Sequence, residues 1–370
     1  MTGMKLLKMK LNNTLNNSLI IYANFDVGFN LGSIPKYLVE NYEDVILYSI
    51  YFPDIVHNGD SNITVFKKGS LSKVTATYTS KSKDVFSVIL YYLSFFVNLS
   101  SIRLRNLNKN IVLISSNPYL IFFGNLLKLH TIYIVGDIMR ISKNNIISRL
   151  KSNITAKVLG CSLKHADHRW YISRSLKNYF RGSNIKKGFV QSLGIDNNTK
   201  KLVKTEKRVL YIGTFDKAKG IALIDSVAKN LDKYQFVFVG GNATYQHNNT
   251  SVYTPVVDEV QLRVLLGNYN YIAVAPYMPD AVKYLGDPTK IKQYLSYGYP
   301  VITTACVEFS KIINKYHAGI VIDYSEKQLY RAILTIANNY QYYVKGVHNL
   351  LNAYYYEDLY KPVFKKQFGK

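Results

Sequence analysis

A lysine and a glutamine three residues apart, Lys290 and Gln293, lie in the stretch GDPTKIKQYLSYGYPVIT, residues 286–303. This stretch predicts a turn, a short helix that ends at a glycine, and a buried strand. Because the two residues are three apart, both side chains share one face near the helix start. The apolar strand and proline at residues 272–276 should deliver that helix start to the carboxyl edge of a parallel sheet. A cation beside an amide at such an edge suits a ligand with phosphate and ribose groups.

A second candidate is the turn GTFDKAKG, residues 213–220, between a predicted strand at 209–212 and a helix at 221–231. The turn lacks the GxGxxG pattern, which argues against a dinucleotide-dependent dehydrogenase. Its closing Lys219-Gly220 pair opens the next helix. The turn therefore brings a lysine to a helix N-terminus, where the backbone favours anions.

Apolar strands must position both candidates. The chain has 370 residues, more than one core usually serves, which favours two domains. Continuous β-branched runs closed by Gly, Ser or Asn predict parallel sheets covered on both faces. The polar residues 194–206 predict a linker between the two sets. The expected strands are 19–22, 45–51, 63–66, 111–114, 131–135 and 168–172, then 209–212, 235–239, 271–275, 301–303 and 320–322.

The block at 286–303, with its Gly-x-Pro-Val-Ile run and the preceding Pro276, resembles the donor-binding segment of GT-B glycosyltransferases. The resemblance implies an α/β fold of the GT-B class, with two Rossmann-like parallel-sheet domains facing a central cleft. It assigns acceptor binding to residues 1–200 and nucleotide-sugar binding to residues 201–350. Residues 351–370 would form a C-terminal helix or tail that returns to the first domain.

The resemblance also implies donor-site roles. Lys219 and Lys290 would contact the donor diphosphate, and Thr214 occupies a position where the family often has arginine. Tyr253 would lie against the base, and Tyr277 follows a strand end that faces the ligand. The implied donor-binding residues are Gly213, Thr214, Lys219, Gly240, Tyr253, Tyr277, Lys290 and Gln293.

Retaining members of the superfamily carry two glutamates that this chain lacks, since Leu285 and Gln293 stand at the matching positions. The pattern around Lys290 instead resembles the inverting glucuronosyltransferases of exopolysaccharide assembly. Asp137 follows the strand at 131–135 and would be the base that takes the proton of the acceptor hydroxyl. Its alternative role is a helix N-cap, and Asp26 is the second candidate for the base. The expected acceptor-binding residues are Asp26, Gly28, Gly32 and Asn117.

No Asp-x-Asp pair follows a strand, so we expect no catalytic metal and no other cofactor; the nucleotide sugar is a substrate. Lysines and helix N-termini would stabilise the leaving diphosphate. The two cysteines, Cys161 and Cys306, lie far apart and without metal-site spacing, which fits a reducing compartment.

The net charge of +24 predicts an anionic partner surface. Residues 1–200 hold 26 basic and 10 acidic residues, and residues 140–187 hold twelve basic residues and one acid. The apolar stretch 86–99 is too short to cross a bilayer, and it predicts either a buried helix or an interfacial one. We expect a cytoplasmic protein at the inner face of the membrane, with a glycan or lipid-linked acceptor and no nucleic acid.

Two other functions compete with glycosyl transfer. A nucleic-acid-binding protein would use the same basic face, but the chain carries no recognised nucleic-acid motif. A GT-B-shaped epimerase or a catalytically inactive sugar-nucleotide binder would share the donor site. UDP is the donor nucleotide expected from the family, and GDP is left open. The sequence does not indicate the oligomeric state.

Overall fold

The computed structural model describes most of both halves of the chain. The described residues are 18–24, 33–42, 44–49, 85–136, 146–181, 188–199, 207–215, 217–240, 251–254, 259–267, 269–279 and 286–368. The chain forms two compact units, Met1–Gly194 with Tyr356–Lys370, and Ile195–Tyr355. The chain first passes from one unit to the other after Gly194, at the start of the polar stretch predicted as a linker. Leu193 and Ile195, on either side of this position, are buried. Ile195 also forms a parallel bridge to Tyr355, where the chain crosses back.

The first unit is built on a parallel sheet in the order β2-β1-β3-β4-β5-β6. Its described strands are β1 (Ser18–Asn24), β2 (Val45–Ser49), β3 (Asn110–Ser115), β4 (His130–Val135), β5 (His168–Tyr171) and β6 (Phe189–Val190). Alternate residues of β1 and β3, such as Ile21 and Leu113, pack with α3 and α4 in one apolar cluster. The strand expected at 63–66 lies outside the described residues.

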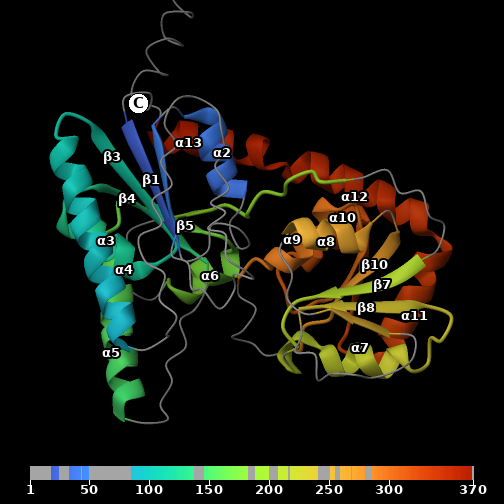
Figure 1. Ribbon diagram of the computed structural model, residues 1–370. Coiled ribbons are helices and arrows are strands. Elements are labelled where there is room, and N and C mark those ends of the chain that lie inside the picture. The colour runs from blue at the N-terminus through green and yellow to red at the C-terminus, as the bar shows by residue number, and fades with distance from the viewer. Residues whose placement is uncertain are drawn as a thin grey trace, which may run out of the picture. The chain divides into compact units, whose positions relative to one another are not determined.

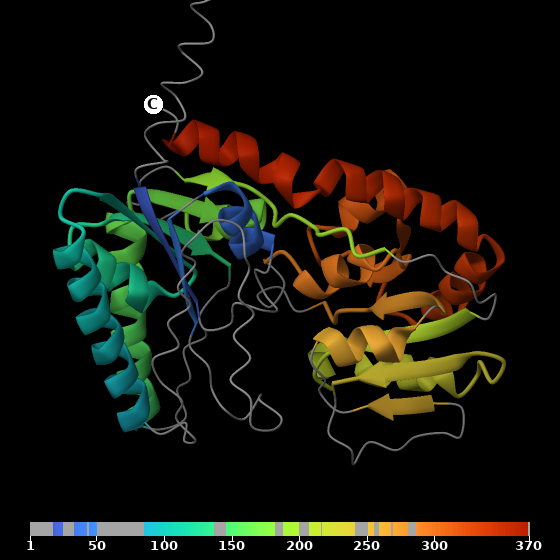
Figure 2. The same cartoon turned by 45° about the horizontal axis from the view of Figure 1, so that its top comes forward.

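Helices cover this sheet on its two faces, with α3, α4 and α5 together on one of them (Figures 1 and 2). The ring of Tyr37 in α2 stacks on Phe364 of α13 at 5.3 Å, and the Tyr360 hydroxyl accepts a 2.7 Å hydrogen bond from Gly194 N–H. The C-terminal return, expected over 351–370, begins in the structure at Tyr356. The helices are α2 (Ser33–Asn41), α3 (Val85–Arg105), α4 (Pro118–Leu126), α5 (Ile146–His165), α6 (Arg174–Tyr179) and α13 (Tyr356–Phe368).

The second unit has a parallel sheet in the order β12-β11-β10-β7-β8-β9. Its strands are β7 (Lys207–Ile212), β8 (Gln235–Val239), β9 (Ser251–Thr254), β10 (Asn270–Ala275), β11 (Val301–Thr304) and β12 (Gly319–Ile322). The neighbours β7 and β10 are the point where the strand order reverses. From β7 the chain proceeds to β8 on one side, and from β10 it proceeds to β11 on the other.

Apolar residues cover both faces of the second sheet, which explains its uninterrupted hydrophobic strands. Leu210 and Ala273 face a cluster with α8, α9, α10 and α12, whereas Val209 and Ile272 face a cluster with α7 and α11. The helices are α7 (Ile221–Ala228), α8 (Glu259–Leu266), α9 (Thr289–Ser296), α10 (Ser310–Tyr316), α11 (Glu326–Asn338) and α12 (Tyr340–Tyr354), with a 3-10 turn at Lys217–Lys219.

None of the helices in the described part of the chain has the length and hydropathy needed to span a bilayer.

Candidate functional site

The strongest candidate site lies at the carboxyl ends of β7 and β10, where the strand order of the second sheet reverses. In open α/β sheets, ligands bind outside the carboxyl ends of the strands at this switch point. The turn after β7 and the segment after β10 also touch, because Met278 N–H donates a 3.0 Å hydrogen bond to Ala218 O. The site is therefore walled by two loops that converge from neighbouring strands.

Two glycines allow this close approach. Gly213 has φ +135° and Gly220 has φ +73°, backbone conformations that side chains disfavour. A Cβ on Gly220 would lie 2.1 Å from Pro276 O, and one on Gly213 would lie 2.6 Å from the Nζ of Lys290. The turn thus closes on β10 and on α9 only because both positions lack a side chain.

Lys290 stands in the first turn of α9 and extends over the turn after β7. Its Nζ is buried, lies 4.0 Å from the centroid of the Tyr211 ring, and has no hydrogen-bond partner among the described residues. Burial lowers the pKa of Lys290 well below its usual value, and the charge of Lys219 lowers it further. Holding the ammonium form here without an anion is costly. An anionic ligand would supply a partner for the Lys290 ammonium group.

Lys219 belongs to the same turn. Its Nζ donates a 2.6 Å hydrogen bond to Thr214 Oγ1, while the Tyr211 hydroxyl donates a 2.7 Å bond to Thr214 O. The following helix, α7, begins at Ile221, and its N-cap residue Gly220 provides no side-chain cap. Two lysines therefore meet at Gly213 and Thr214, and the uncapped start of α7 follows Lys219 in the chain. Lysines and helix N-termini both favour phosphate oxygens.

A tyrosine that the sequence interpretation missed fixes α9 against β7. The buried Tyr294 hydroxyl accepts a 2.6 Å hydrogen bond from Ile212 N–H at the end of β7, and it lies 3.5 Å from Val274 O of β10. Tyr294 follows Lys290 by four residues, so both share one helix face. That spacing was a usable signal.

A buried ion pair, also missed, ties the start of α9 to the loop before it. Lys292 Nζ donates to Asp287 Oδ2, and both side chains are almost fully buried. The Nζ also lies 4.8 Å from the Phe309 ring centroid. The lysines at 290 and 292 therefore differ in kind, because one has a carboxylate partner and the other has none among the described residues.

The other predicted donor residues lie around this centre. Gly240 ends β8 with φ +102°, and a Cβ there would lie 3.1 Å from Gly213 O, so the turns after β7 and β8 adjoin. Gln293 lies one turn along α9 from Lys290. Tyr277 is buried and its carbonyl accepts a 2.7 Å hydrogen bond from Thr304 Oγ1.

Tyr253 belongs to β9 and pairs with Phe238, and its side chain lies outside the described residues. The side chains that the sequence interpretation placed at the diphosphate, Lys219 and Lys290, meet at Gly213 and Thr214. Their contact with a donor stays a prediction.

The predicted residues of the first unit are mostly outside the described part of the chain. This applies to Asp137, Asp26, Gly28 and Gly32, so the catalytic base stays a prediction. Asn117 is described and buried: its Oδ1 accepts a 2.9 Å hydrogen bond from Tyr119 N–H and caps α4. No group of three or more His, Cys, Asp or Glu side chains able to hold a metal ion occurs within the described residues.

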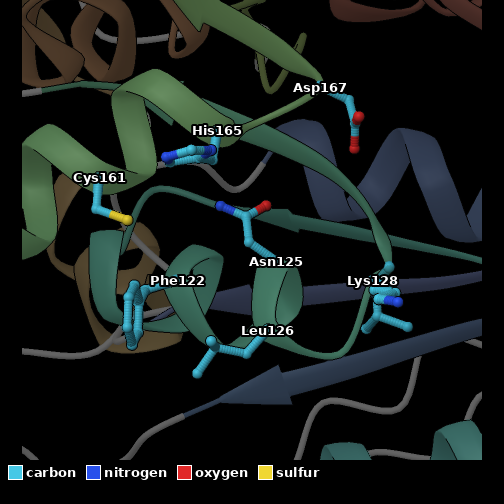
Figure 3. Close-up of a pocket in the computed structure, with 8 residues that line it drawn as sticks. Phe122, Asn125, Leu126, Lys128, Cys161, His165 and Asp167 are labelled. Atoms are coloured by element: carbon cyan, nitrogen blue, oxygen red, sulfur yellow. The ribbon is translucent and has the colours of Figure 1, made fainter.

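A cavity of about 510 Å³ lies between α4 and α5 in the first unit (Figure 3). Asn125 lines it from α4, and Cys161 and His165 line it from α5. Lys128 and Asp167, which also line it, precede β4 and β5. The cavity is therefore at the amino edge of the sheet, opposite to the edge where ligands of such sheets bind.

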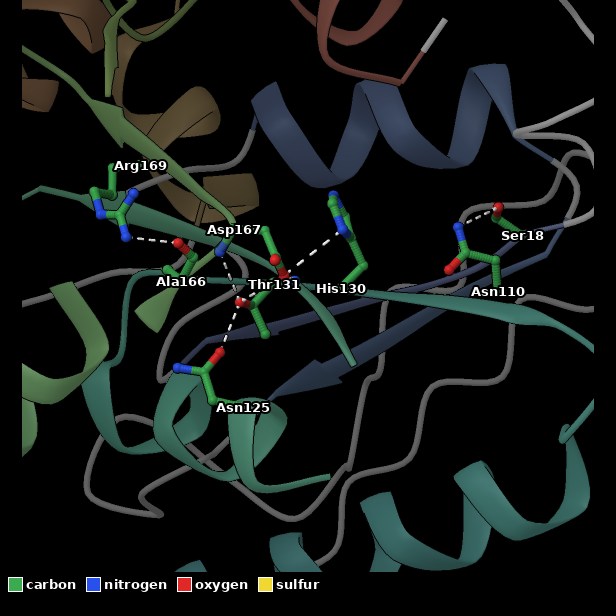
Figure 4. A network of polar contacts seen from close by, with 8 residues as sticks. All are labelled: Ser18, Asn110, Asn125, His130, Thr131, Ala166, Asp167 and Arg169. Carbon is green, nitrogen blue, oxygen red and sulfur yellow. Dashed lines mark hydrogen bonds and ion pairs between the residues drawn. The ribbon is translucent and has the colours of Figure 1, made fainter. Parts of the chain in front are cut away.

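Polar contacts at the same edge hold β4, β5 and α5 together (Figure 4). Thr131 N–H donates a 2.8 Å hydrogen bond to Asp167 Oδ2, and Thr131 Oγ1 donates a 2.8 Å bond to Asn125 Oδ1. The buried Arg169 donates through Nη2 to Lys164 O at 2.9 Å and to Ala166 O at 2.6 Å, at the end of α5. This network therefore supports the fold at the amino edge of the first sheet.

Known proteins are similar to this chain in fold and, over part of the second unit, in sequence. Residues 206–339 match the family model described as "Glycosyl transferases group 1". No curated protein matches the sequence. Sucrose-phosphate synthase from Thermosynechococcus elongatus is similar in structure, with a TM-score of 0.66 and 13% identity, covering 95% of this chain and 99% of that one.

Two further structures match over similar lengths. WaaG, a glycosyltransferase involved in lipopolysaccharide biosynthesis, gives a TM-score of 0.63 at 12% identity, covering 95% of this chain and 100% of WaaG. HepE of Anabaena, in complex with UDP, gives 0.59 at 10% identity, covering 94% of this chain and 99% of HepE. These matches confirm the expected GT-B fold and do not specify a subtype. The chain therefore has the GT-B fold, and residues 206–339 of its second unit are similar in sequence to the glycosyl transferases group 1.

Proposed function

We propose that the protein transfers a sugar from a UDP-sugar to a hydroxyl of a glycan or lipid-linked acceptor, without a divalent metal. The observation that carries the proposal is the buried Nζ of Lys290 at the switch point of the second sheet, which has no hydrogen-bond partner within the described part of the chain and feels the charge of Lys219. A nucleoside diphosphate supplies the anion that this site lacks among the described residues. HepE, one of the similar structures, is described in complex with UDP.

In the proposed reaction, the acceptor oxygen attacks the anomeric carbon and the bond from that carbon to the diphosphate oxygen breaks. Lys219 and Lys290 stabilise the negative charge that develops on the leaving UDP. Asp137 takes the acceptor proton, and transfer by this route inverts the anomeric centre. A trehalose-6-phosphate synthase among the similar structures is described with glycosyl transfer with retention, so the configuration of the product decides between these routes.

The test is a thermal-shift titration with UDP, GDP, ADP and CMP, each with and without EDTA, and with single-stranded DNA as a control. A ligand at 100 times its Kd adds about 2.7 kcal/mol, which raises the melting temperature by several degrees. We expect UDP to stabilise the protein selectively and independently of EDTA. A response to DNA alone would reject the proposal in favour of nucleic-acid binding.

The Lys290→Met variant should lose the UDP response, whereas the matched control Lys327→Met, on the exposed first turn of α11, should keep it. Removing one charged hydrogen-bonding group costs about 1.5–3 kcal/mol of binding, or roughly 10- to 150-fold in Kd. Equal UDP affinity in both variants would contradict the assignment of Lys290. UDP binding without any transfer of sugar would instead indicate a catalytically inactive binder.

A further inference from the structure

The outer surface of α3 combines exposed aliphatic side chains with arginines, a combination that the donor site does not explain. Leu93, Val97 and Leu104 are 53%, 64% and 69% exposed. They stand four and seven residues apart, so they form one stripe along the helix. Leu107, just beyond the helix, is 65% exposed as well. Such a cluster on a single helix marks an interaction surface.

Three described aromatic side chains of α3, those of Tyr92, Phe95 and Phe96, point the other way. The ring of Tyr92 packs on Tyr119 at 4.8 Å and that of Phe96 on Phe123 at 5.2 Å, both on α4. Phe95 is also buried against the first sheet. Within the described part of α3, the aromatic side chains thus pack inward, and the exposed large side chains are aliphatic.

The charged residues of α3 and of the two helices beside it have one sign. Arg103 and Arg105 lie in the last turn of α3, on either side of Leu104. No Asp or Glu occurs in the sequences of α3, α4 or α5, the three helices that share one face of the first sheet (Figures 1 and 2). On α5, Lys157 and Lys164 are exposed and seven residues apart, which gives that helix a basic face too.

From this surface we infer that the helical layer α3–α4–α5 docks on an anionic lipid bilayer, with the stripe Leu93–Val97–Leu104 entering the headgroup boundary and the arginines contacting lipid phosphates. A bilayer offers both an apolar interior and a negative surface. Nucleic acid supplies the charge without the apolar phase. A second copy of the chain would place like charges of the same helix together.

The inference rests on the proposed function only in its purpose, which is to bring the enzyme to a lipid-linked acceptor; the binding itself is independent of the donor site. The test is co-sedimentation of the full chain with vesicles of phosphatidylcholine alone, or of equal parts phosphatidylcholine and phosphatidylglycerol. We expect partitioning onto the anionic vesicles only, weakened by salt. A wild-type protein that binds neither kind of vesicle, or both equally, would overturn the inference.

Variants locate the surface. The triple change Leu93→Gln, Val97→Gln and Leu104→Gln should reduce the partition coefficient at least about tenfold. Replacing Arg103 and Arg105 by Gln should reduce it by roughly 30-fold, since each basic residue near the surface contributes about fivefold. Val264→Gln is the matched control, because this side chain is 76% exposed on α8 of the second unit.

Two readouts keep the outcomes separate. An unchanged partition coefficient in the triple variant would overturn the inference, as would a wild-type dimer that this variant converts to monomer. An unchanged melting temperature and UDP-induced shift show that the variants are folded and keep a working donor site. Vesicle binding without any UDP response in the wild type would retain this inference and reject the proposed function.

Discussion

Two buried lysines of the same helix should respond oppositely to the same substitution. Lys290 and Lys292 both lie in the first half of α9 and both have pKa values lowered by burial. Lys292 has Asp287 as a partner, whereas Lys290 Nζ has none among the described residues. We expect Lys290→Met to stabilise the ligand-free protein and Lys292→Met to destabilise it.

The structure sets the size of each effect. An unsatisfied buried polar group costs about 1–3 kcal/mol, and methionine can keep the packing of Lys290 on the Tyr211 ring. For a unit of this size, that gain raises the melting temperature by about 2–12 °C. Removing Lys292 leaves the Asp287 carboxylate buried and uncompensated, which costs about 3–5 kcal/mol, or about 6–20 °C.

The pH dependence follows from the lowered pKa of Lys290. The unfolded state binds more protons than the folded state between the folded pKa and the usual value of 10.5, so stability rises with pH in that window. The destabilisation is complete below the folded pKa and is absent above the unfolded one. The advantage of Lys290→Met over the wild type should therefore be largest at low pH and shrink as the pH approaches 10.5.

The assay is thermal unfolding of wild type and both variants without nucleotide, across a range of pH. A Lys290→Met protein that is less stable than the wild type by as much as Lys292→Met would refute the reasoning. It would show that Lys290 has a partner comparable to Asp287. A stability difference that does not change with pH would refute the pKa argument alone.

Three further predictions concern the turn, the anchor and the base. Gly220→Ala should cost about 1–3 kcal/mol of stability and weaken UDP binding, since its Cβ would clash with Pro276 O at φ +73°; Gly160→Ala in α5, where a Cβ meets nothing within 4 Å, should stabilise by up to about 1 kcal/mol in the same unfolding assay. Tyr294→Phe should lower the stability measured by chemical denaturation by about 1–2 kcal/mol, because a partly buried main-chain N–H loses its acceptor; an unchanged midpoint would contradict this. Asp137→Asn should abolish sugar transfer while leaving the UDP-induced thermal shift intact, and normal turnover would exclude it as the base.

The sequence was most informative where local pattern and topology agree. Continuous apolar strands predicted parallel sheets buried on both faces, and the turn ending at Gly220 together with Lys290 placed a candidate site at their carboxyl edge. The pairing of Lys292 with Asp287 was not predictable, because it depends on the path of a loop in three dimensions. The strand Ser251–Thr254 was missed for a similar reason: four residues are too few to show a period.

The orientation of α3 shows a different limit. Its run of aromatic and aliphatic residues predicted either a buried or an interfacial helix, since both need apolar side chains. The choice between inner and outer faces came from contacts with α4, a helix that follows in sequence but whose packing angle no local pattern encodes. The described structure resolves the two faces, with Phe95 buried and Val97 exposed two residues later.

The most direct test of the central claim, that Lys219 and Lys290 bind the diphosphate of a UDP-sugar, is isothermal titration of UDP and UMP into the wild type and the Lys290→Met variant. The structure predicts that the wild type binds UDP more tightly than UMP, and that Lys290→Met removes most of this difference while changing UMP affinity little. Equal losses for UDP and UMP, or no loss for either, would contradict the assignment of the diphosphate to this site.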